Sequence, residues 1–451
     1  MSDERIDALV QEATRLRYSR RGVLKRAAAL GLSTTATAAV LARAGTPATA
    51  ARRQGPVTLN WFAARDQTGY TPTQVEAFNA QNPNVQINYQ EQGATTTDLH
   101  DKFVTVATAQ DASVDLVSMD VPFVPEFAAA GWVQPVEEIL PAAEREAFFP
   151  GTIEGATYDA GEGGQLYAVP WYNNGPGLFY RKDLLDGAGL QPPKTYDELQ
   201  QIATQLQTPE ISGIVFQASQ TEGGLITFLE YLWGHGGDVL DAEGNVVIDD
   251  GPGAEALQRL VDFVYTAKIA PEAVLTMATG NDAQNPFIEG RAVFLRMWMT
   301  AAGAMDADTS AVKGKWGVTT LPSKDGQQPG PGCLGTWNLG ISAFSEQAEA
   351  AAEAIRYFTS QEQQTARYLG NGNLPARSAV FDAPEVTARY PYVPTLRSAF
   401  EALKPRPVTP YYSQMSSDAL QPNFGAAMTR QKEPAQAVAD MASGIEQVLS
   451  Q

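Results

Sequence analysis

Residues 165–185 read Gln-Leu-Tyr-Ala-Val-Pro-Trp-Tyr-Asn-Asn-Gly-Pro-Gly-Leu-Phe-Tyr-Arg-Lys-Asp-Leu-Leu. A short strand pattern over residues 166–169 is interrupted by Pro170, because proline donates no hydrogen bond to a neighbouring strand. The Trp-Tyr-Asn-Asn sequence at 171–174 then precedes a Gly-Pro-Gly turn and a second apolar run, residues 178–180. Two rings with flat apolar faces, followed by two amides, suit a ligand that is rich in hydroxyl groups. The alternative interpretation is an aromatic corner of the core with capping asparagines.

The composition limits what the rest of the chain can be. A chain of 451 residues is too long for one ordinary hydrophobic core, so that two lobes are expected. One cysteine, Cys333, excludes a disulfide framework and a cysteine metal cluster, and two histidines argue against most zinc sites and a histidine-based triad. The formal net charge of −19 disfavours nucleic acid and anionic membranes as partners. The sequence indicates no metal ion and no cofactor.

Residues 1–50 have the pattern of a twin-arginine signal peptide. Polar residues lead to the Arg20-Arg21 pair, then to a run rich in Ala and Leu and to an Ala-x-Ala exit at residues 48–50. A basic amphipathic helix is the alternative, but Gly31 and the following run of Ser and Thr argue against it. We therefore expect export by the twin-arginine pathway to an extracytoplasmic location, either the periplasm or the cell surface. No cysteine lies near the exit, so that we expect no lipid anchor.

Strand and helix patterns alternate from Val57 onward. Val57, Leu59 and Trp61 alternate with polar residues, as in a half-buried strand, and Thr71-Pro72 offers a cap and a first-turn proline for a helix. Residues 115–120 are a further expected strand, with Asp120 at its C-terminal end. Such alternation favours a mostly parallel sheet with helices on both faces, and ligands bind beyond the carboxyl ends of its strands.

A second α/β unit is expected after residue 185. A capping box opens a helix at Thr195, a buried strand pattern over residues 291–295 leads to Trp298, and an amphipathic helix closes the chain over residues 434–449. We expect an α/β fold with two lobes, each a sheet flanked by helices, and three chain crossings near residues 168–171, 317–320 and 370–375. The predicted lobes comprise residues 51–168 with 320–372, and residues 169–319 with 373–451.

Several short motifs carry a family resemblance. They are Met119-Asp120, Tyr-Ala-Val-Pro at 167–170 with Tyr172 and Asn174, Leu-Gly-Thr-Trp-Asn-Leu-Gly-Ile-Ser at 334–342, and Arg-Pro-Val-Thr-Pro-Tyr-Tyr at 406–412. In this order, over residues 57–449, the chain resembles the extracellular solute-binding proteins of ABC sugar importers, above all trehalose/maltose-binding proteins. The resemblance implies the two-lobe periplasmic-binding-protein fold with three hinge crossings. It also implies a protein that is not an enzyme, that captures a disaccharide or small oligosaccharide and that delivers it to the permease subunits of an ABC transporter. We expect a monomer.

The resemblance also implies a sugar site. The positions that contact sugar in relatives are those of Asp120, Tyr172, Asn174, Trp298, Trp337 and Arg406, and Gln67 falls near a further contact position. A carboxylate can accept two sugar hydroxyls, a pyranose face stacks on tryptophan, and an arginine held between two prolines presents a fork of donors. We expect Asp120 and Trp337 to come from one lobe and the other four from the second lobe. The alternatives are a helix-capping aspartate, two core tryptophans and a surface arginine.

Two departures from the relatives leave the exact sugar open. Several relatives have a glutamate where this chain has Gly280-Asn281-Asp282, and many have an aspartate at the position of Asn174. A secreted glycosidase is the alternative function, although no motif marks the pair of carboxyl groups, about 5–10 Å apart, that it needs. A binder of another solute, such as glycerol phosphate, an oligosaccharide or a polyamine, is a third. A phosphate would need several basic residues, and only Arg406 can be placed in the cleft.

Overall fold

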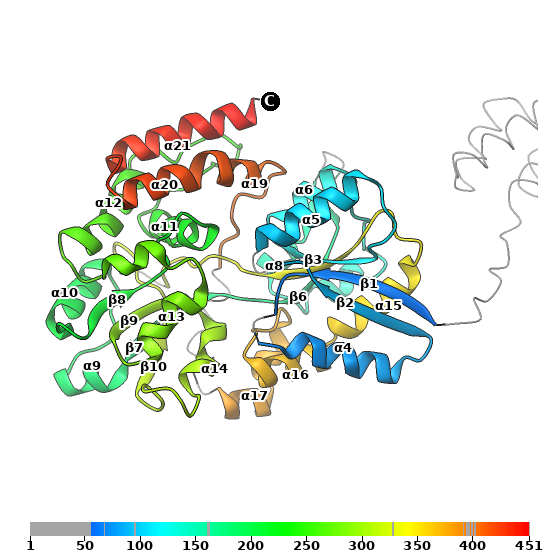
Figure 1. Ribbon diagram of the computed structural model, residues 1–451, viewed down its shortest axis with the longest axis horizontal. Helices are drawn as coiled ribbons and strands as arrows, with labels where there is room; N and C mark the ends of the chain where they lie inside the picture. The colour runs from blue at the N-terminus through cyan, green and yellow to red at the C-terminus, as the bar shows by residue number, and fades with distance from the viewer. Residues whose placement is uncertain are drawn as a thin grey trace, which may run out of the picture. The chain divides into compact units, whose positions relative to one another are not determined.

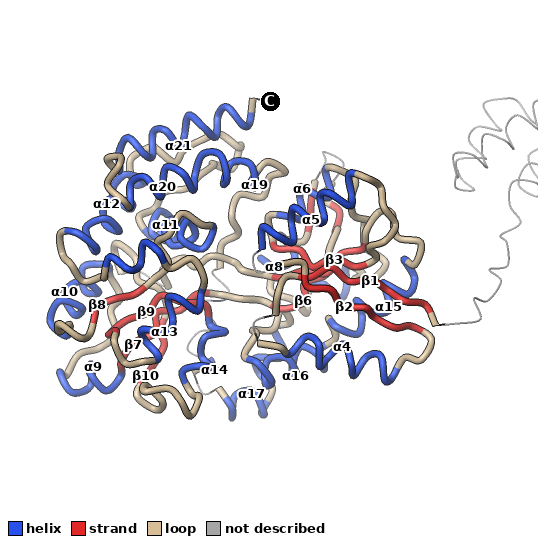
Figure 2. The backbone as a smooth tube through the Cα atoms, in the orientation of Figure 1, coloured by secondary structure: helices blue, strands red, loops and turns tan. Residues whose placement is uncertain are grey.

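The computed structural model describes residues 56–66, 68–93, 96–159, 163–326, 329–390, 392–393, 397, 400 and 403–450. The predicted signal peptide, residues 1–50, and the predicted sugar contact Gln67 lie outside these residues. Residues 58–451 form one compact unit. Its long strands form two separate sheets, which Figure 2 shows as two groups of red strands.

The first sheet has five strands in the order β2 (Val85–Glu91), β1 (Val57–Ala63), β3 (Leu116–Asp120), β11 (Trp337–Ile341) and β6 (Val169–Tyr172). Around it lie α4 (Tyr70–Gln81), α5 (Thr96–Thr108), α6 (Phe123–Ala129), α7 (Ala142–Arg145), α8 (Pro150–Glu154), α15 (Ala348–Phe358), α16 (Gln361–Asn371), the turn η3 (Ser378–Asp382), α17 (Pro384–Arg389) and the hairpin of β4 (Thr157–Tyr158) with β5 (Gln165–Leu166) (Figure 1). We call these elements the first lobe.

The second sheet has four strands in the order β10 (Trp316–Thr319), β7 (Pro176–Arg181), β9 (Ala292–Trp298) and β8 (Ser212–Val215). Its helices are α9 (Lys182–Ala188), α10 (Tyr196–Leu206), α11 (Glu222–Gly234), α12 (Pro252–Tyr265), α13 (Gly280–Ile288), α14 (Ala302–Met305), α19 (Tyr412–Met415), α20 (Gln421–Met428) and α21 (Pro434–Leu449), with the short turns η1 (Glu272–Thr276), η2 (Met299–Ala301) and η4 (Ser416–Leu420). We call these elements the second lobe. The two-lobe α/β fold expected from the sequence is therefore present.

Both sheets are mixed, whereas the alternation over residues 57–120 predicted a mostly parallel sheet for the first of them. β1 pairs in parallel with β3, and β8 with β9, as the alternation of strand and helix predicts. β11 runs antiparallel to both β3 and β6, and β7 runs antiparallel to β9 and β10. β7 and β11 are the strands by which the chain enters each sheet after it has crossed from the other lobe, and each of them runs opposite to both of its neighbours.

Helix starts show where local sequence is sufficient and where it is not. Thr195 caps α10 as predicted, because its hydroxyl accepts the backbone N–H of Glu198 at 3.0 Å. The predicted cap at Thr71 is wrong, since α4 begins at Tyr70. Asp66 binds the start of this helix instead, because its carboxylate accepts the backbone N–H groups of Thr68 and Thr71 at 2.9 and 2.6 Å.

Pro170 does not end the strand that contains it. β6 runs from Val169 to Tyr172 and is the edge strand of the first sheet. The carbonyl oxygen of Pro170 points out of the sheet and accepts a hydrogen bond from Gln364 at 3.4 Å. The nitrogen and the carbonyl of one strand residue point to the same side, so that the Pro170 nitrogen also points away from β11. No strand of the described part of the chain lies on that side, and the missing N–H therefore costs no hydrogen bond between strands. The predicted lobe boundary at residue 168 therefore falls four residues before the end of this strand.

The segments between the two sheets run side by side. The N–H of Gly335 donates to the carbonyl of Asn174 at 2.9 Å, and the N–H of Asn173 donates to the carbonyl of Leu374, which still belongs to the first lobe, at 2.6 Å. The first crossing thus lies at residues 173–175, between β6 and β7, and the second at 320–336, between β10 and β11. Residues near 377 still pair with the first lobe, through the bridge of Arg377 to Phe148. The third crossing therefore follows the predicted position, 370–375, because the chain first packs η3 and α17 against α16.

Candidate functional site

Three strand ends of the first sheet meet at one edge. Trp337, the first residue of β11, lies directly opposite Asp120 of β3 on one side and opposite Tyr172 of β6 on the other. Residues opposite one another in antiparallel strands place their side chains on the same face of the sheet. Tyr172 was expected in the second lobe with Arg406, but it comes from the first lobe, because β6 continues past Pro170.

Arg406 reaches this edge from the other lobe. It stands in the segment that leads into α19 and is only 2% exposed. Its Nη2 donates to Asp120 Oδ1 at 2.6 Å, and its Nη1 donates to Glu222 Oε1 at 2.9 Å. Asp120 lies at the end of β3 and Glu222 on the first turn of α11, so that one guanidinium joins carboxylates of both lobes. The alternative of a surface arginine does not hold.

The electrostatic surroundings keep Arg406 charged. Burial alone would lower its pKa, but the nearby Asp120 and Glu222 carboxylates outweigh burial and raise the pKa well above its ordinary value. Burial also raises the pKa of Tyr412 well above its usual range, and the charge of Glu222 adds to this shift. Tyr412 therefore keeps the proton with which its hydroxyl donates to Glu222 Oε1 at 2.7 Å.

Trp298 and Asn174 meet at Gly335, two residues before Trp337. A Cβ atom added at Gly335 would lie 3.0 Å from Cζ3 of Trp298 and 3.0 Å from the carbonyl oxygen of Asn174. Asn174 Oδ1 at this point, and Nε of the Arg406 guanidinium that binds Asp120, are buried and have no hydrogen-bond partner among the described residues. An acceptor and a donor are thus left for a ligand that can both donate and accept.

The Trp298 ring rests on a buried ion pair. The Arg296 guanidinium lies 4.7 Å from the centre of this ring, within the range of a cation–π contact. Arg296 in turn forms two hydrogen bonds to Glu230 of α11, and both side chains are at least 96% buried. Glu230 also accepts the backbone N–H of Cys333 at 3.1 Å, which ties the pair to the second crossing. The tryptophan is half-buried and packs against the core with part of its ring.

The Trp-Tyr-Asn-Asn stretch combines both interpretations made from the sequence. Trp171 and Asn173 are buried, at 3% and 1% exposure, and Trp171 contacts Trp61 and the guanidinium of Arg367. Tyr172 and Asn174 are only half-buried. Alternate residues of this stretch, which runs from the end of β6 into the first crossing, therefore form a corner of the core and the candidate site.

The departure at residues 280–282 has a structural role. Gly280 begins α13, and Asp282 accepts the N–H and the hydroxyl of Thr279 at 2.9 and 2.8 Å, completing a capping box. The acid at this place in the chain is therefore engaged in starting the helix.

The partners of Arg406 and a second contact between the lobes were not predicted from the sequence. Ser413 of α19 donates to Glu126 of α6 at 2.6 Å, and the other oxygen of Glu126 bonds to His100 at 2.8 Å. One signal for Glu222 was present in the sequence. Glu222 begins the helix that follows strand β8 and thus lies beyond the carboxyl end of a strand. The same kind of position was the reason for choosing Asp120.

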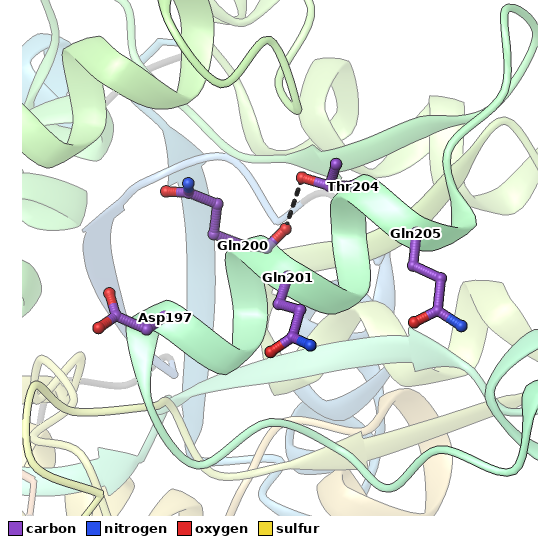
Figure 3. A pocket seen from close by; sticks show the side chains of 5 residues that line it. All are labelled: Asp197, Gln200, Gln201, Thr204 and Gln205. Atoms are coloured by element: carbon purple, nitrogen blue, oxygen red, sulfur yellow. Dashed lines mark hydrogen bonds between the residues drawn. The ribbon is translucent and has the colours of Figure 1, made fainter.

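A hollow of about 360 Å³ lies elsewhere, along α10. Asp197, Gln200, Gln201, Thr204 and Gln205 line it, and Figure 3 shows that all five side chains project from this one helix. A binding site brings together groups from several elements, as the region around Arg406 does. We therefore assign the candidate site to the strand ends and not to this hollow.

Two features of the described residues bear on other functions. These residues contain no group of three or more His, Cys, Asp and Glu side chains that could hold a metal ion. None of their helices is long and apolar enough to cross a lipid bilayer.

Comparison with known proteins gives the family. The profile of the bacterial extracellular solute-binding proteins matches residues 64–365. A curated "probable ABC transporter-binding protein" of Deinococcus radiodurans is 32% identical over 310 residues, 66% of this chain and 72% of that protein. A mannitol-binding protein of Pseudomonas aeruginosa is 25% identical over 68% of this chain and 70% of its own length. The solved structure of maltose-bound MalE3 from T. maritima superposes with a TM-score of 0.80 and 34% identity, over 86% of this chain and 99% of that chain. The chain therefore belongs to the family of bacterial extracellular solute-binding proteins.

Proposed function

We propose that the protein captures a disaccharide of the trehalose or maltose type between its two lobes and delivers it to the permease of an ABC importer. The observation that carries this proposal is the contact between Asp120 of the first lobe and Arg406, which Glu222 holds on the second lobe. A sugar that bridges these groups would favour the closed arrangement of the lobes by its contacts with both.

The chemistry of the surrounding groups supports a sugar. Trp298, Trp337 and Tyr172 are aromatic residues that are only half-buried, and an aromatic ring with an exposed face can stack on a pyranose. Asn174 Oδ1 and Arg406 Nε are buried and lack partners among the described residues. A hydroxyl group can satisfy an acceptor and a donor at once, which an apolar solute cannot.

The relatives support the same class of ligand. The T. maritima structure holds maltose, and the Pseudomonas aeruginosa protein is named for mannitol. Both ligands are neutral and rich in hydroxyl groups. Paired aromatic platforms suit a ligand with two rings better than an open-chain alcohol, which is why we place a disaccharide first.

Membership of an extracellular family implies a location outside the cytoplasm. We propose that the twin-arginine pathway exports the protein as a folded monomer. Replacing Arg20 and Arg21 together by lysine should leave precursor in the cytoplasm, as an immunoblot of fractionated cells would show. Normal export of the double variant would refute this route.

A thermal-shift screen over about twenty sugars and sugar alcohols tests the function. A bound ligand raises the melting temperature through the term RT ln(1 + [L]/Kd), so that the correct sugar should stand out. Calorimetry with the best ligand, followed by chromatography of the recovered sugar, distinguishes the alternatives. A binding protein returns the disaccharide intact, whereas cleavage would establish a glycosidase instead. If glycerol phosphate or a polyamine produces the only shift, the disaccharide proposal is wrong.

A further inference from the structure

Glu222 is the most heavily bonded carboxylate around the candidate site. It lies on the first turn of α11, and its side chain is 28% exposed. Its two oxygens accept four hydrogen bonds: from Arg406 Nη1 at 2.9 Å, Tyr412 Oη at 2.7 Å, Ser416 Oγ at 2.6 Å and Gln421 Nε2 at 3.3 Å. Except for Arg406 in the preceding segment, these donors belong to the second lobe's elements α19, η4 and α20.

When the lobes separate, Arg406 loses its contact with one of its two carboxylates and keeps its contact with the other. Asp120 belongs to the first lobe, and the only other described partner of its carboxylate is the backbone N–H of Val121 at 2.8 Å. Opening the lobes breaks the contact between Asp120 and Arg406. The contact with Glu222 remains, because its other partners move with α11. The orientation of Arg406 in an open, empty protein therefore depends on Glu222.

The pair of carboxylates also sets the charge that a ligand meets. Arg406 carries one positive charge, whereas Asp120 and Glu222 together carry two negative charges. The two carboxylates therefore more than neutralise the guanidinium, and the cluster of Asp120, Glu222 and Arg406 carries one net negative charge. Such a cluster still offers donors and acceptors to neutral hydroxyl groups, but it repels a phosphate.

We propose that Glu222 positions Arg406 for the ligand and makes the site selective for neutral sugars over sugar phosphates. This inference rests on the proposed function. Glu222 acts through Arg406 and is a positioning residue, because its acceptor atoms are occupied by protein donors.

Calorimetry on the Glu222→Gln variant tests the proposal with two pairs of probes, trehalose with trehalose 6-phosphate and maltose with maltose 1-phosphate. The variant keeps the shape of the side chain but removes its charge. We expect the affinity for the neutral sugar to fall about tenfold or more, as a charge-assisted hydrogen bond is lost. The affinity ratio of phosphate ester to neutral sugar should rise by about tenfold. A purely structural defect would lower both affinities by the same factor, and an unchanged ratio would overturn the proposal.

A matched control and a double variant complete the test. Glu255→Gln makes the same change in an exposed pair, that of Glu255 on α12 of the second lobe with Lys324 of the second crossing, and should leave both affinities unchanged. In an Arg406→Met background, adding Glu222→Gln should change sugar affinity by less than about twofold, because no guanidinium remains to be positioned. An equal loss in both backgrounds would refute the positioning role. If the wild-type protein binds no neutral sugar, the proposed function fails as well, whereas sugar binding with an unchanged ratio overturns this inference alone.

Discussion

Replacing Asp120 by asparagine should weaken sugar binding without unfolding the protein. The substitution keeps the size of the side chain and removes one charge of the ion pair with Arg406. Arg406 is 2% exposed, but it keeps its bond to Glu222, so that no buried cation is left without a carboxylate. The large penalty for an unpaired buried charge is therefore avoided.

The size of the loss in sugar affinity follows from the hydrogen bond that the side chain at position 120 accepts. A hydrogen bond to a charged group contributes about 1.5–3 kcal/mol, whereas a neutral one contributes about 0.5–1.5 kcal/mol. Asparagine can still accept through its amide oxygen, so that the difference is about 1–2 kcal/mol. A change of about 1.4 kcal/mol is tenfold in affinity, and the dissociation constant should rise about 5- to 30-fold.

Isothermal titration calorimetry with the best disaccharide measures this change. The Glu255→Gln variant, which alters an exposed pair with Lys324, serves as the control and should bind as the wild type does. The melting temperature of the unliganded Asp120→Asn variant shows whether it is folded. An unchanged dissociation constant in a folded variant would refute the reasoning, because Asp120 would then be a structural acid at the end of β3.

Three further outcomes are expected. Trp298→Ala should lower sugar affinity by more than the loss of one neutral hydrogen bond, about 0.5–1.5 kcal/mol, because stacking area is lost; unchanged calorimetry would make the ring part of the core. Glu230→Gln should lower the free energy of unfolding in urea by about 3–5 kcal/mol, since the buried charge of Arg296 loses its partner, and a change below about 1 kcal/mol would contradict this. Burial alone would lower the pKa of His100, but the carboxylates of Glu126 and Asp101 together outweigh burial and raise the pKa above its usual value. The protonated His100 therefore stabilises the folded state, and this contribution to the free energy of unfolding is fully present below about pH 6.5 and is lost as the pH rises through the pKa of the folded state. His100→Gln should remove this pH dependence from the free energy of unfolding.

Local signals in the sequence predicted much of the fold. The capping box at Thr195 and the closing helix over residues 434–449 lie where they were expected, because both depend on residues a few positions apart. The cap of α4 was misplaced at Thr71, although Asp66 lies only five residues before it. Placing it correctly requires knowledge of the turn that brings Asp66 back to the helix start.

Edge position explains the error at Pro170. A proline interrupts a central strand, but β6 has a partner on one side only, and strand order cannot be read from a single segment. The same error placed Tyr172 in the wrong lobe. Three of the residues proposed for the site, Asp120, Trp337 and Arg406, nevertheless lie at the same strand end.

The partners of Arg406 could not be predicted from the sequence. Glu222 lies 184 positions from Arg406, and Asp120 lies 286 positions away. No local pattern joins residues at such separations. The position of Glu222 at a helix start was visible, but many acids share that preference for electrostatic reasons, so that its role follows only from the fold.

A crystal structure of the protein with its best disaccharide tests the central claim most directly. We predict density for the sugar between Asp120 and Arg406, with a pyranose face on Trp298 and hydroxyl groups within hydrogen-bond distance of Asn174 Oδ1 and Arg406 Nε. Sugar bound elsewhere, for example in the hollow along α10, with the contact between Asp120 and Arg406 unchanged, would contradict the account.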